Sequence, residues 1–430
     1  MSSGGYRAVL RAPGVAFLLT TSLIARLPVA MANLAIILRI AAATGSYARA
    51  GGVTGAYVVG TGIMGPVLGR MADRVGRRPV LLLAALANAA GLIALAFISM
   101  HATLLVLIVA AVSGASLPPV APAVRSLWPV LVRGDLRSSL YAFDATMQEA
   151  TFMVGPTLVA LLSTLSGPPA ALIACGGIGL VGTLALSLHP AISSPRADPM
   201  TEDRPAGEAT ATGGGAAVGD LATVQALEPA GDDPVVPLRR RFQPAGIPGL
   251  GTMVVVVFVF LAAIVVVEVT VVAFAGRAHA SNQAGILLAV WSSGSMAGGF
   301  AFGARTAHAG TRVLAPVLAA AGLGFLCLAA APGVGVLYLL LFVAGVSIAP
   351  GFSCIYGLVG SLAPSTGSVE AFSWVASGIQ MGAAGGAALG GLLVDTIGTR
   401  GSFVLAAGGA AATAVIALRR TRRLRPARGA

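Results

Sequence analysis

Residues 69–82 read GRMADRVGRRPVLL, with four arginines, one aspartate and two glycines in ten residues before the chain returns to apolar side chains. The stretch interrupts a 430-residue sequence in which 57% of residues are hydrophobic and 10% are charged. Charged residues make up about 25% of an ordinary soluble domain. The composition therefore predicts an integral membrane protein, and the stretch is read as a short polar loop between two membrane-spanning helices.

All 27 basic residues are arginine, and the formal net charge is +12. The arginines gather at the ends of apolar segments and in short loops, which indicates membrane orientation and argues against nucleic-acid binding. Cys175, Cys327 and Cys354 lie in apolar stretches, so they are read as buried small hydrophobic residues. We find no phosphate-binding loop, metal-ligand cluster or activated nucleophile, and we expect no enzyme, no metal and no cofactor.

Apolar segments of about 17 to 29 residues recur along the chain, each close to the roughly 20 residues that span a bilayer core. They cover residues 13–41, 52–69, 79–99, 103–128, 139–165, 169–188, 250–276, 283–303, 313–331, 334–360, 370–393 and 401–418. The pattern predicts an all-α membrane fold of twelve transmembrane helices. We place the first six-helix bundle in residues 1–190 and the second in residues 245–418.

Residues 191–244 have a different composition, rich in Gly, Pro and Ala, and hold eight of the fifteen acidic residues. They predict a disordered linker, with a regulatory or partner-binding segment as the alternative. Residues 419–430 form a basic tail whose arginines would be attracted to anionic lipid. Because most loop arginines fall on one side, we expect a multi-pass cell-membrane protein with the linker and both termini in the cytoplasm.

The two halves resemble each other in sequence. GASLPPVAPAVRSL (114–127) aligns with GVSIAPGFSCIYGL (345–358), which pairs Pro119 with Pro350. Two further weak matches follow in the same order and at nearly the same offset. We interpret them as an internal duplication of six helices, the arrangement in which one half of a transporter rocks against the other.

The loop residues Gly69, Asp73, Arg74, Gly76, Arg77 and Arg78 resemble the signature between the second and third helices of the major facilitator superfamily. The likeness extends over the chain through its two sets of six segments and its central loop, and comes nearest to drug or metabolite efflux members of actinobacterial type. It implies a cytoplasmic latch, with Asp73 facing the N-terminus of the eleventh helix, whose free amides favour an anion. The alternative is that these arginines only set topology.

Glycines recur at close intervals in the second segment, and every fourth residue in the eleventh, at Gly378, Gly382, Gly386 and Gly390. Such ladders allow helix backbones to approach closely in lipid. In the resembled family the second and eleventh helices cross between the halves. We therefore expect these faces to form a sliding contact, with static packing as the alternative.

Prolines mark expected bends in the fourth, fifth and tenth segments, because a proline removes a helix hydrogen bond. Pro119 and Pro350 occupy equivalent positions in the fourth and tenth, and Gly155 with Pro156 lies in the fifth. The Gly-Pro pair resembles the family's antiporter signature without its further glycines. The resemblance favours export, and we expect all four residues to act as hinges.

Three ionisable residues lie deep in apolar segments: Arg26, Glu149 and Glu268. Each would be costly in lipid, so each is expected to face protein or a wet cavity. We expect Arg26 to pair with Glu149, and Glu268, without a basic neighbour along its helix, to carry the proton. Asp144 and Arg125 lie nearer the cytoplasmic ends and are read as gate or packing charges.

Further polar and aromatic residues are candidates for a substrate cavity: Asn33, Gln148, Tyr356, Trp374 and Gln380. Together with the resemblance they predict a secondary active transporter that moves a small amphipathic molecule by alternating access, as proton-coupled efflux driven by the proton gradient. The alternatives are an uptake symporter or facilitator, and a receptor or scaffold without transport. The expected partners are the substrate, protons and membrane lipids, with no nucleic acid and a monomeric state.

Overall fold

The protein is described by a computed structural model, which covers residues 14–100, 102–131, 136–193, 247, 249–280, 283–305, 311–364 and 367–421. Every regular element in these ranges is helical. Residues 194–244 of the predicted linker and residues 422–430 of the predicted tail lie outside the described part of the chain.

The first half of the chain consists of α2 to α10. Their bounds are α2 Val15–Thr44, α3 Tyr47–Val75, α4 Arg77–Phe97, α5 Thr103–Ala115, α6 Val120–Arg125, α7 Trp128–Leu131, α8 Leu136–Ser166, α9 Pro168–Ser187 and α10 Pro190–Ser193. The second half consists of α11 to α16. Their bounds are α11 Leu250–Arg277, α12 Ala284–Arg305, α13 Thr311–Leu328, α14 Val334–Gly345, α15 Ile348–Leu362 and α16 Ser368–Thr421.

Ten stretches within the described residues are long and apolar enough to cross a membrane, and Val313–Leu328 is a shorter apolar helix. One of the ten, Ser368–Arg419, contains two helices that meet at Gly398, whose φ of 76° breaks the helical path. Counting that pair separately accounts for all twelve predicted segments. The predicted all-α membrane fold is therefore confirmed.

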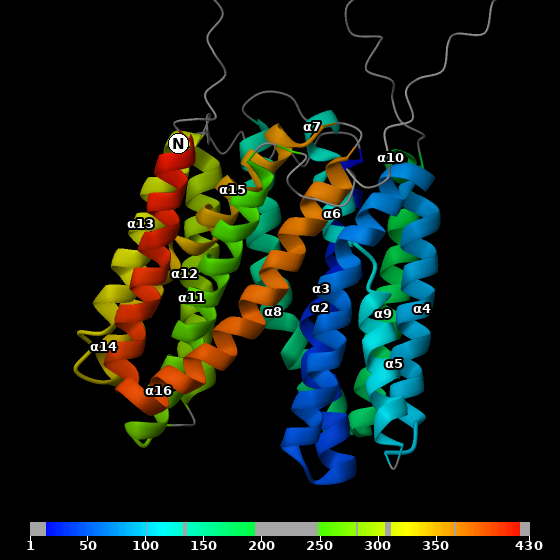
Figure 1. Ribbon diagram of the computed structural model, residues 1–430, viewed down its shortest axis with the longest axis horizontal. Coiled ribbons are helices and arrows are strands. Elements are labelled where there is room, and N and C mark those ends of the chain that lie inside the picture. The colour runs from blue at the N-terminus through cyan, green and yellow to red at the C-terminus, as the bar shows by residue number, and fades with distance from the viewer. Residues whose placement is uncertain are drawn as a thin grey trace, which may run out of the picture.

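The helices stand side by side in two groups, with α2 to α5 and α9 toward the right, α11 to α14 toward the left, and α8 and the first part of α16 between them (Figure 1). In the first half α2 packs against α8 and α9, and α3 packs against α5; in the second half α16 packs against α11 and α13. The halves meet where α3 contacts α16 and where α8 contacts α12 and α15. We call the end that carries α7 and α10, uppermost in Figure 1, the upper end.

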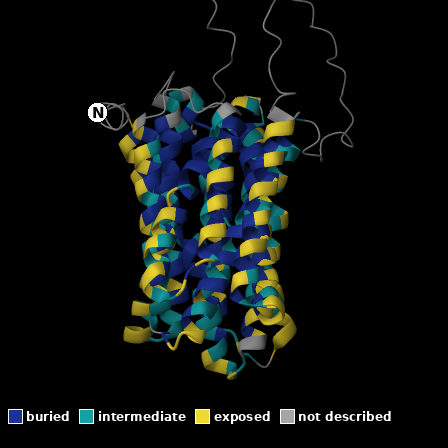
Figure 2. Ribbon diagram, turned by 90° about the vertical axis from the view of Figure 1, so that its left-hand side faces the viewer, coloured by how far each residue is buried: buried dark blue, intermediate teal, exposed yellow. Residues whose placement is uncertain are grey.

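Exposed residues lie largely on the outer faces of the helices, whereas buried ones fill the interior (Figure 2). Many exposed side chains are large and apolar, such as Ile63, Leu83 and Leu104, which are 66%, 69% and 71% exposed. Helices with apolar outer faces and internally satisfied backbones suit a hydrocarbon environment. Exposure of so many large apolar side chains to water would be unfavourable.

The two predicted breaks at equivalent prolines are present. Helix α5 ends at Ala115 and α6 begins after Pro119, while α14 ends at Gly345 and α15 begins at Ile348. Pro350 lies in the first turn of α15, where a missing backbone N–H costs little. In contrast, Pro156 lies inside the continuous helix α8, so that residue does not divide its helix.

The glycine-rich faces of α3 and α16 pack against different helices and do not face each other. In α3, an added Cβ at Gly65 or Gly69 would meet Ser377 or Ser373 of α16, so this face does lie between the halves. The ladder from Gly378 to Gly390 instead faces α11, within the second half; an added Cβ at Gly382 would lie 2.5 Å from the Phe258 carbonyl oxygen. The prediction that the α16 ladder forms the contact between halves is therefore wrong.

Candidate functional site

At the upper end, α3 is joined to the first turn of α16. The carboxylate of Asp73 accepts hydrogen bonds from the backbone N–H groups of Val369, at 3.3 Å, and Glu370, at 2.8 Å. These are free amides at a helix N-terminus, where a negative charge is stabilised. The predicted contact between Asp73 and the eleventh transmembrane helix is confirmed.

A second link beside it was not predicted. Arg70 forms a two-point ion pair with Glu370, with its Nε 2.9 Å from Oε2 and its Nη2 in contact with Oε1. Bidentate arginine–carboxylate pairs are among the stronger polar contacts in proteins. Glu370 could have been noticed as an acidic residue in a first helical turn, the position that an N-terminal dipole favours.

The other loop residues contribute in different ways. Arg77 interacts electrostatically with Asp73, whereas Arg74 and Arg78 are exposed. Gly76 has a φ of 110°, which a side chain would strain, and it forms the tight turn between α3 and α4. The loop signature thus supplies one acidic contact, one turn and a basic surface.

Further contacts between the halves lie near the same end of α8. Ser139 donates a hydrogen bond of 2.7 Å to the carbonyl oxygen of Gly303. Tyr141 packs against Phe372, with ring centroids 6.3 Å apart, and both rings are buried. Together with the links of Asp73 and Arg70, these contacts hold the two halves together at the upper end.

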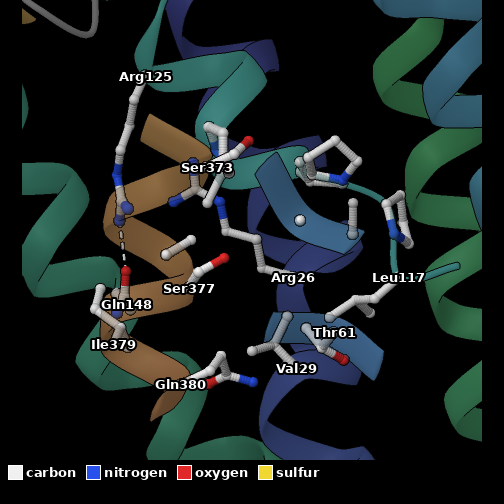
Figure 3. A pocket seen from close by; sticks show the side chains of 18 of the residues that line it. Arg26, Val29, Thr61, Leu117, Arg125, Gln148, Ser373, Ser377, Ile379 and Gln380 are labelled. Atoms are coloured by element: carbon white, nitrogen blue, oxygen red, sulfur yellow. Dashed lines mark hydrogen bonds between the residues drawn. The ribbon is translucent and has the colours of Figure 1, made fainter. Parts of the chain in front are cut away.

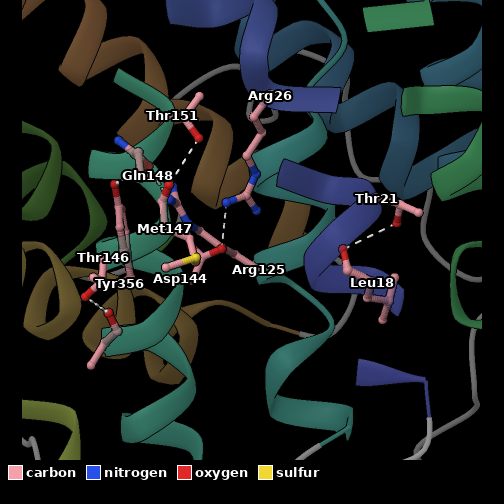
Figure 4. A network of polar contacts seen from close by, with 11 residues as sticks. Leu18, Thr21, Arg26, Arg125, Asp144, Thr146, Met147, Gln148, Thr151 and Tyr356 are labelled. Carbon is pink, nitrogen blue, oxygen red and sulfur yellow. Dashed lines mark hydrogen bonds and ion pairs between the residues drawn. The ribbon is translucent and has the colours of Figure 1, made fainter. Parts of the chain in front are cut away.

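A buried charge cluster lies in the first half of the chain (Figure 4). Arg26 Nη1 and Arg125 Nε each lie 2.6 Å from a different oxygen of Asp144. Arg125 also donates to Gln148 and stacks on the Tyr356 ring, 3.6 Å from its centroid. One carboxylate thus serves two guanidinium groups, and the ion pairs leave one net positive charge.

This cluster corrects the predicted pairing. Arg26 is paired with Asp144, not with Glu149. Asp144 and Arg125, which were read as peripheral gate or packing charges, are 1% and 2% exposed and form the centre of the cluster. The structural reason is the rotation of α8: Asp144 and Gln148 lie one turn apart on the face toward α2 and α6, and Glu149 lies on another face.

Glu149 belongs to a separate cluster that joins the halves. It interacts electrostatically with Glu268 of α11 and hydrogen-bonds the side chain of Ser295 in α12. The Ser295 hydroxyl oxygen also accepts the Ala349 N–H at 3.2 Å, next to the break between α14 and α15. Two like charges placed together favour a shared or bound proton. The two deep glutamates are thus brought together.

A cavity of ≈ 110 Å³ lies beside the arginine cluster (Figure 3). Helices α2, α3, α8 and α16 and the break between α5 and α6 all contribute to its walls. Of the predicted cavity residues, Gln148 and Gln380 line it, and so does Pro119, which was predicted to act as a hinge. Tyr356 does not line the cavity but contacts two residues that do, Gln148 and Arg125. Asn33 and Trp374 are not among the lining residues.

Several polar atoms around this cavity have no hydrogen-bond partner within the described residues. They are Nε and Nη2 of Arg26 and the hydroxyl oxygens of Ser373 and Ser377. The sequence predictions did not include the two serines. Their spacing of four residues along α16, opposite the α3 glycines, is the signal that could have found them.

Among known sequences, the Major Facilitator Superfamily profile matches residues 18–313. No curated protein matches the chain. In structure the chain is similar to the human organic anion transporter MFSD10, with 18% identity, a TM-score of 0.63, and 96% of this chain and 99% of that chain covered.

Two bacterial structures are similar in the same way. The E. coli fucose:proton symporter is 16% identical, with a TM-score of 0.67 and coverage of 95% of this chain and 99% of that one. A bacterial homologue of the iron transporter ferroportin, in its outward-facing state, is 13% identical, with a TM-score of 0.69 and the same coverage. At such identities the likeness shows the fold alone and does not single out an efflux subtype. Because the profile spans more than half of the sequence and the fold agrees over its length, the chain belongs to the major facilitator superfamily.

Proposed function

We propose that this protein is a proton-coupled secondary transporter that exports a small amphipathic molecule by alternating access. Members of the family are transporters and not enzymes, bind small-molecule substrates and typically function as monomers. Export and proton coupling go beyond what the members of the family share. The observation that carries the proposal is the pairing of Glu149 with Glu268, because it places two carboxylates, one from each half, in one interacting cluster.

Two carboxylates that interact electrostatically, one from each half, suit proton coupling. When the halves are close, mutual repulsion and burial favour a proton on the pair. When the halves separate, hydration favours its release. The protonation state would thus depend on conformation, which coupling to a proton gradient requires.

Residues 1–190 and 245–418 would move as the two bundles, with the upper end in the cytoplasm of the cell membrane. The gathering of arginines in the loops of that end supports this orientation. The links of Asp73 and Arg70 would then close the cytoplasmic side in the conformation described. Export is supported by the resemblance of Gly155 and Pro156 to the family's antiporter signature. In the structure Gly155 packs closely against α2, since an added Cβ would lie 2.8 Å from the Ala30 Cβ.

The test is flux in proteoliposomes, using labelled 4-phenylbutyrate, taurocholate, tetraphenylphosphonium and ethidium as probes, with and without an imposed pH gradient. We expect Glu268→Gln to lose uphill, gradient-driven flux and to keep exchange at equilibrium. Asp395→Asn is the matched control, because Asp395 is an exposed acid in α16 and its change should leave gradient-driven flux intact.

The outcomes separate the alternatives. Gradient-driven accumulation by Glu268→Gln at the normal rate would remove this residue as the proton carrier. Accumulation of a probe on the side toward which the protons flow would indicate an uptake symporter. An absence of saturable flux for every probe, with and without the gradient, would favour a receptor or scaffold.

A further inference from the structure

We propose that the cavity beside Arg26 binds the anionic group of the transported molecule, so that the substrate class is amphipathic monocarboxylates. The inference rests on the proposed function, because it names the substrate class for the same cavity. It is carried by three side chains that line the cavity and hold unpartnered polar atoms: Arg26, Ser373 and Ser377 (Figure 3).

The charge balance points to an anion. Asp144 supplies one negative charge to both Arg26 and Arg125, so the three side chains carry one net positive charge. Arg26 is 5% exposed and uses only Nη1 for Asp144, which leaves Nε and Nη2 without a partner among the described residues. A buried cation with unused donors is costly, and a bound carboxylate would accept from both nitrogens.

The serine hydroxyls complete the donor set. Ser373 and Ser377 are 0% and 5% exposed, and neither hydroxyl has a partner in the described structure. Serine and threonine hydroxyls in helices usually donate to the carbonyl oxygen one turn earlier, as those of Thr21, Thr146 and Ser402 do here. Two buried hydroxyls left free on one wall, with a guanidinium on another, form a site that a polar ligand would satisfy.

The rest of the cavity explains why the ligand would be amphipathic. Its walls include the apolar side chains of Val29, Leu117 and Ile379. A single water needs roughly 10–15 Å³ of such space, so a cavity of ≈ 110 Å³ has room for a small molecule. A carboxylate at Arg26 with a ring or short alkyl chain against the apolar wall fits this arrangement better than an inorganic ion does.

The first test measures binding to the purified full-length protein by calorimetry, so it needs no transport. Benzoate, 4-phenylbutyrate and octanoate are compared with their neutral amides and with chloride. We expect saturable binding of at least one carboxylate and at least tenfold weaker binding of its amide, since hydrogen bonds to a charged group are stronger than those to a neutral one. Combined Ser373→Ala and Ser377→Ala should weaken that carboxylate about tenfold or more, whereas Ser293→Ala, on an exposed position of α12, should not.

The second test needs no added ligand. Ser377→Asp places a carboxylate beside Arg26, and Ser377→Asn places a neutral side chain of the same shape there. We expect the aspartate variant to unfold at the higher temperature and to lose carboxylate binding. At the exposed Ser293 the same pair should show the reverse order, because a charge on an apolar outer face is unfavourable.

Equal binding of acids and amides, chloride binding as tight as that of the carboxylates, or binding of no carboxylate would overturn the proposal. So would an asparagine variant at position 377 that is more stable than the aspartate variant. Carboxylate binding without any flux in proteoliposomes would instead contradict the proposed transport and leave this site standing.

Discussion

Replacing Asp144 with asparagine should be the most destabilising single change among the buried charges. Asp144 is 1% exposed and lies 2.6 Å from a nitrogen of both Arg26 and Arg125. Asp144→Asn leaves two neighbouring buried cations without a counter-charge. Removing one partner of a buried ion pair costs about 3–5 kcal/mol, and a second uncompensated cation places the expected loss at or above that range.

Two further variants should be less destabilised than Asp144→Asn. Arg26→Gln leaves the neutral pair of Arg125 and Asp144, so its loss should be smaller, about 1–3 kcal/mol. Glu149→Gln removes a like charge from beside Glu268, and it should leave stability unchanged or raise it. The expected order of unfolding temperatures is Glu149→Gln highest, Arg26→Gln next and Asp144→Asn lowest.

The assay is thermal unfolding of the detergent-purified variants at one scan rate, since membrane proteins often unfold irreversibly and only ranks are then comparable. The double variant Arg26→Gln with Asp144→Asn should be more stable than Asp144→Asn alone, because it leaves one buried cation in place of two. If Glu149→Gln lost as much stability as Asp144→Asn, the pairing of Arg26 predicted from the sequence would be right and the cluster described above would be wrong.

Three further predictions concern other parts of the molecule. The contacts that join the halves at the upper end are here called the upper seam. Asp73→Asn should loosen this seam, so a cysteine at the buried Ser139 position should react faster with thiol reagents; an unchanged rate would show that Asp73 does not hold the seam. The background is Cys327→Ala, because Cys327 is exposed and not buried as the sequence predicted. Gly382→Ala should lower the unfolding temperature, at a cost of about 1–3 kcal/mol, because its Cβ would lie 2.5 Å from the Phe258 carbonyl oxygen, while Gly391→Ala, with open space around it, should not. Partial burial lowers the pKa of His189, so the unfolded state binds more protons than the folded state. Stability should therefore fall as the pH drops below about 6.5. His189→Gln should flatten this dependence of stability on pH, and an identical slope would show that His189 does not cause it.

Local features of the sequence were enough to predict much of the fold. Continuous apolar segments located the twelve membrane helices. The breaks near Pro119 and before Pro350 followed from aligned prolines in the two halves. The contact of Asp73 with the start of α16 followed from the affinity of an anion for free helix amides. Each of these depends on nearby residues or on a property common to every helix terminus.

The partners of the buried charges could not be predicted in the same way. Asp144 and Glu149 lie on one helix, five residues apart, which corresponds to about 7.5 Å along the axis and roughly 140° around it. Which of them faces Arg26 depends on the rotation of α8. A membrane helix that is apolar on most sides carries little periodic signal to fix that rotation. The same limit applies to the glycine ladder of α16, whose spacing predicts a close contact and not the identity of the partner helix.

One face of α16 connects the upper seam to the candidate anion site. Glu370, Ser373, Ser377 and Gln380 follow one another at intervals of three or four residues, so they lie along one side of the helix over about 15 Å. The first pairs with Arg70, and the other three line the cavity.

The facing side of α3 lies alongside it, with the two helices antiparallel. Asp73 holds the start of α16, Gly69 and Gly65 pack against Ser373 and Ser377, and Thr61 lines the cavity. Because the serine hydroxyls lie on α16 and Arg26 lies on α2, which packs against α3, a shift of α2 and α3 along α16 must move the hydroxyls relative to Arg26. Release of the seam would therefore change the donor set of the anion site directly, and occupancy of that site would in turn bias the seam, since a coupling of this kind is reciprocal.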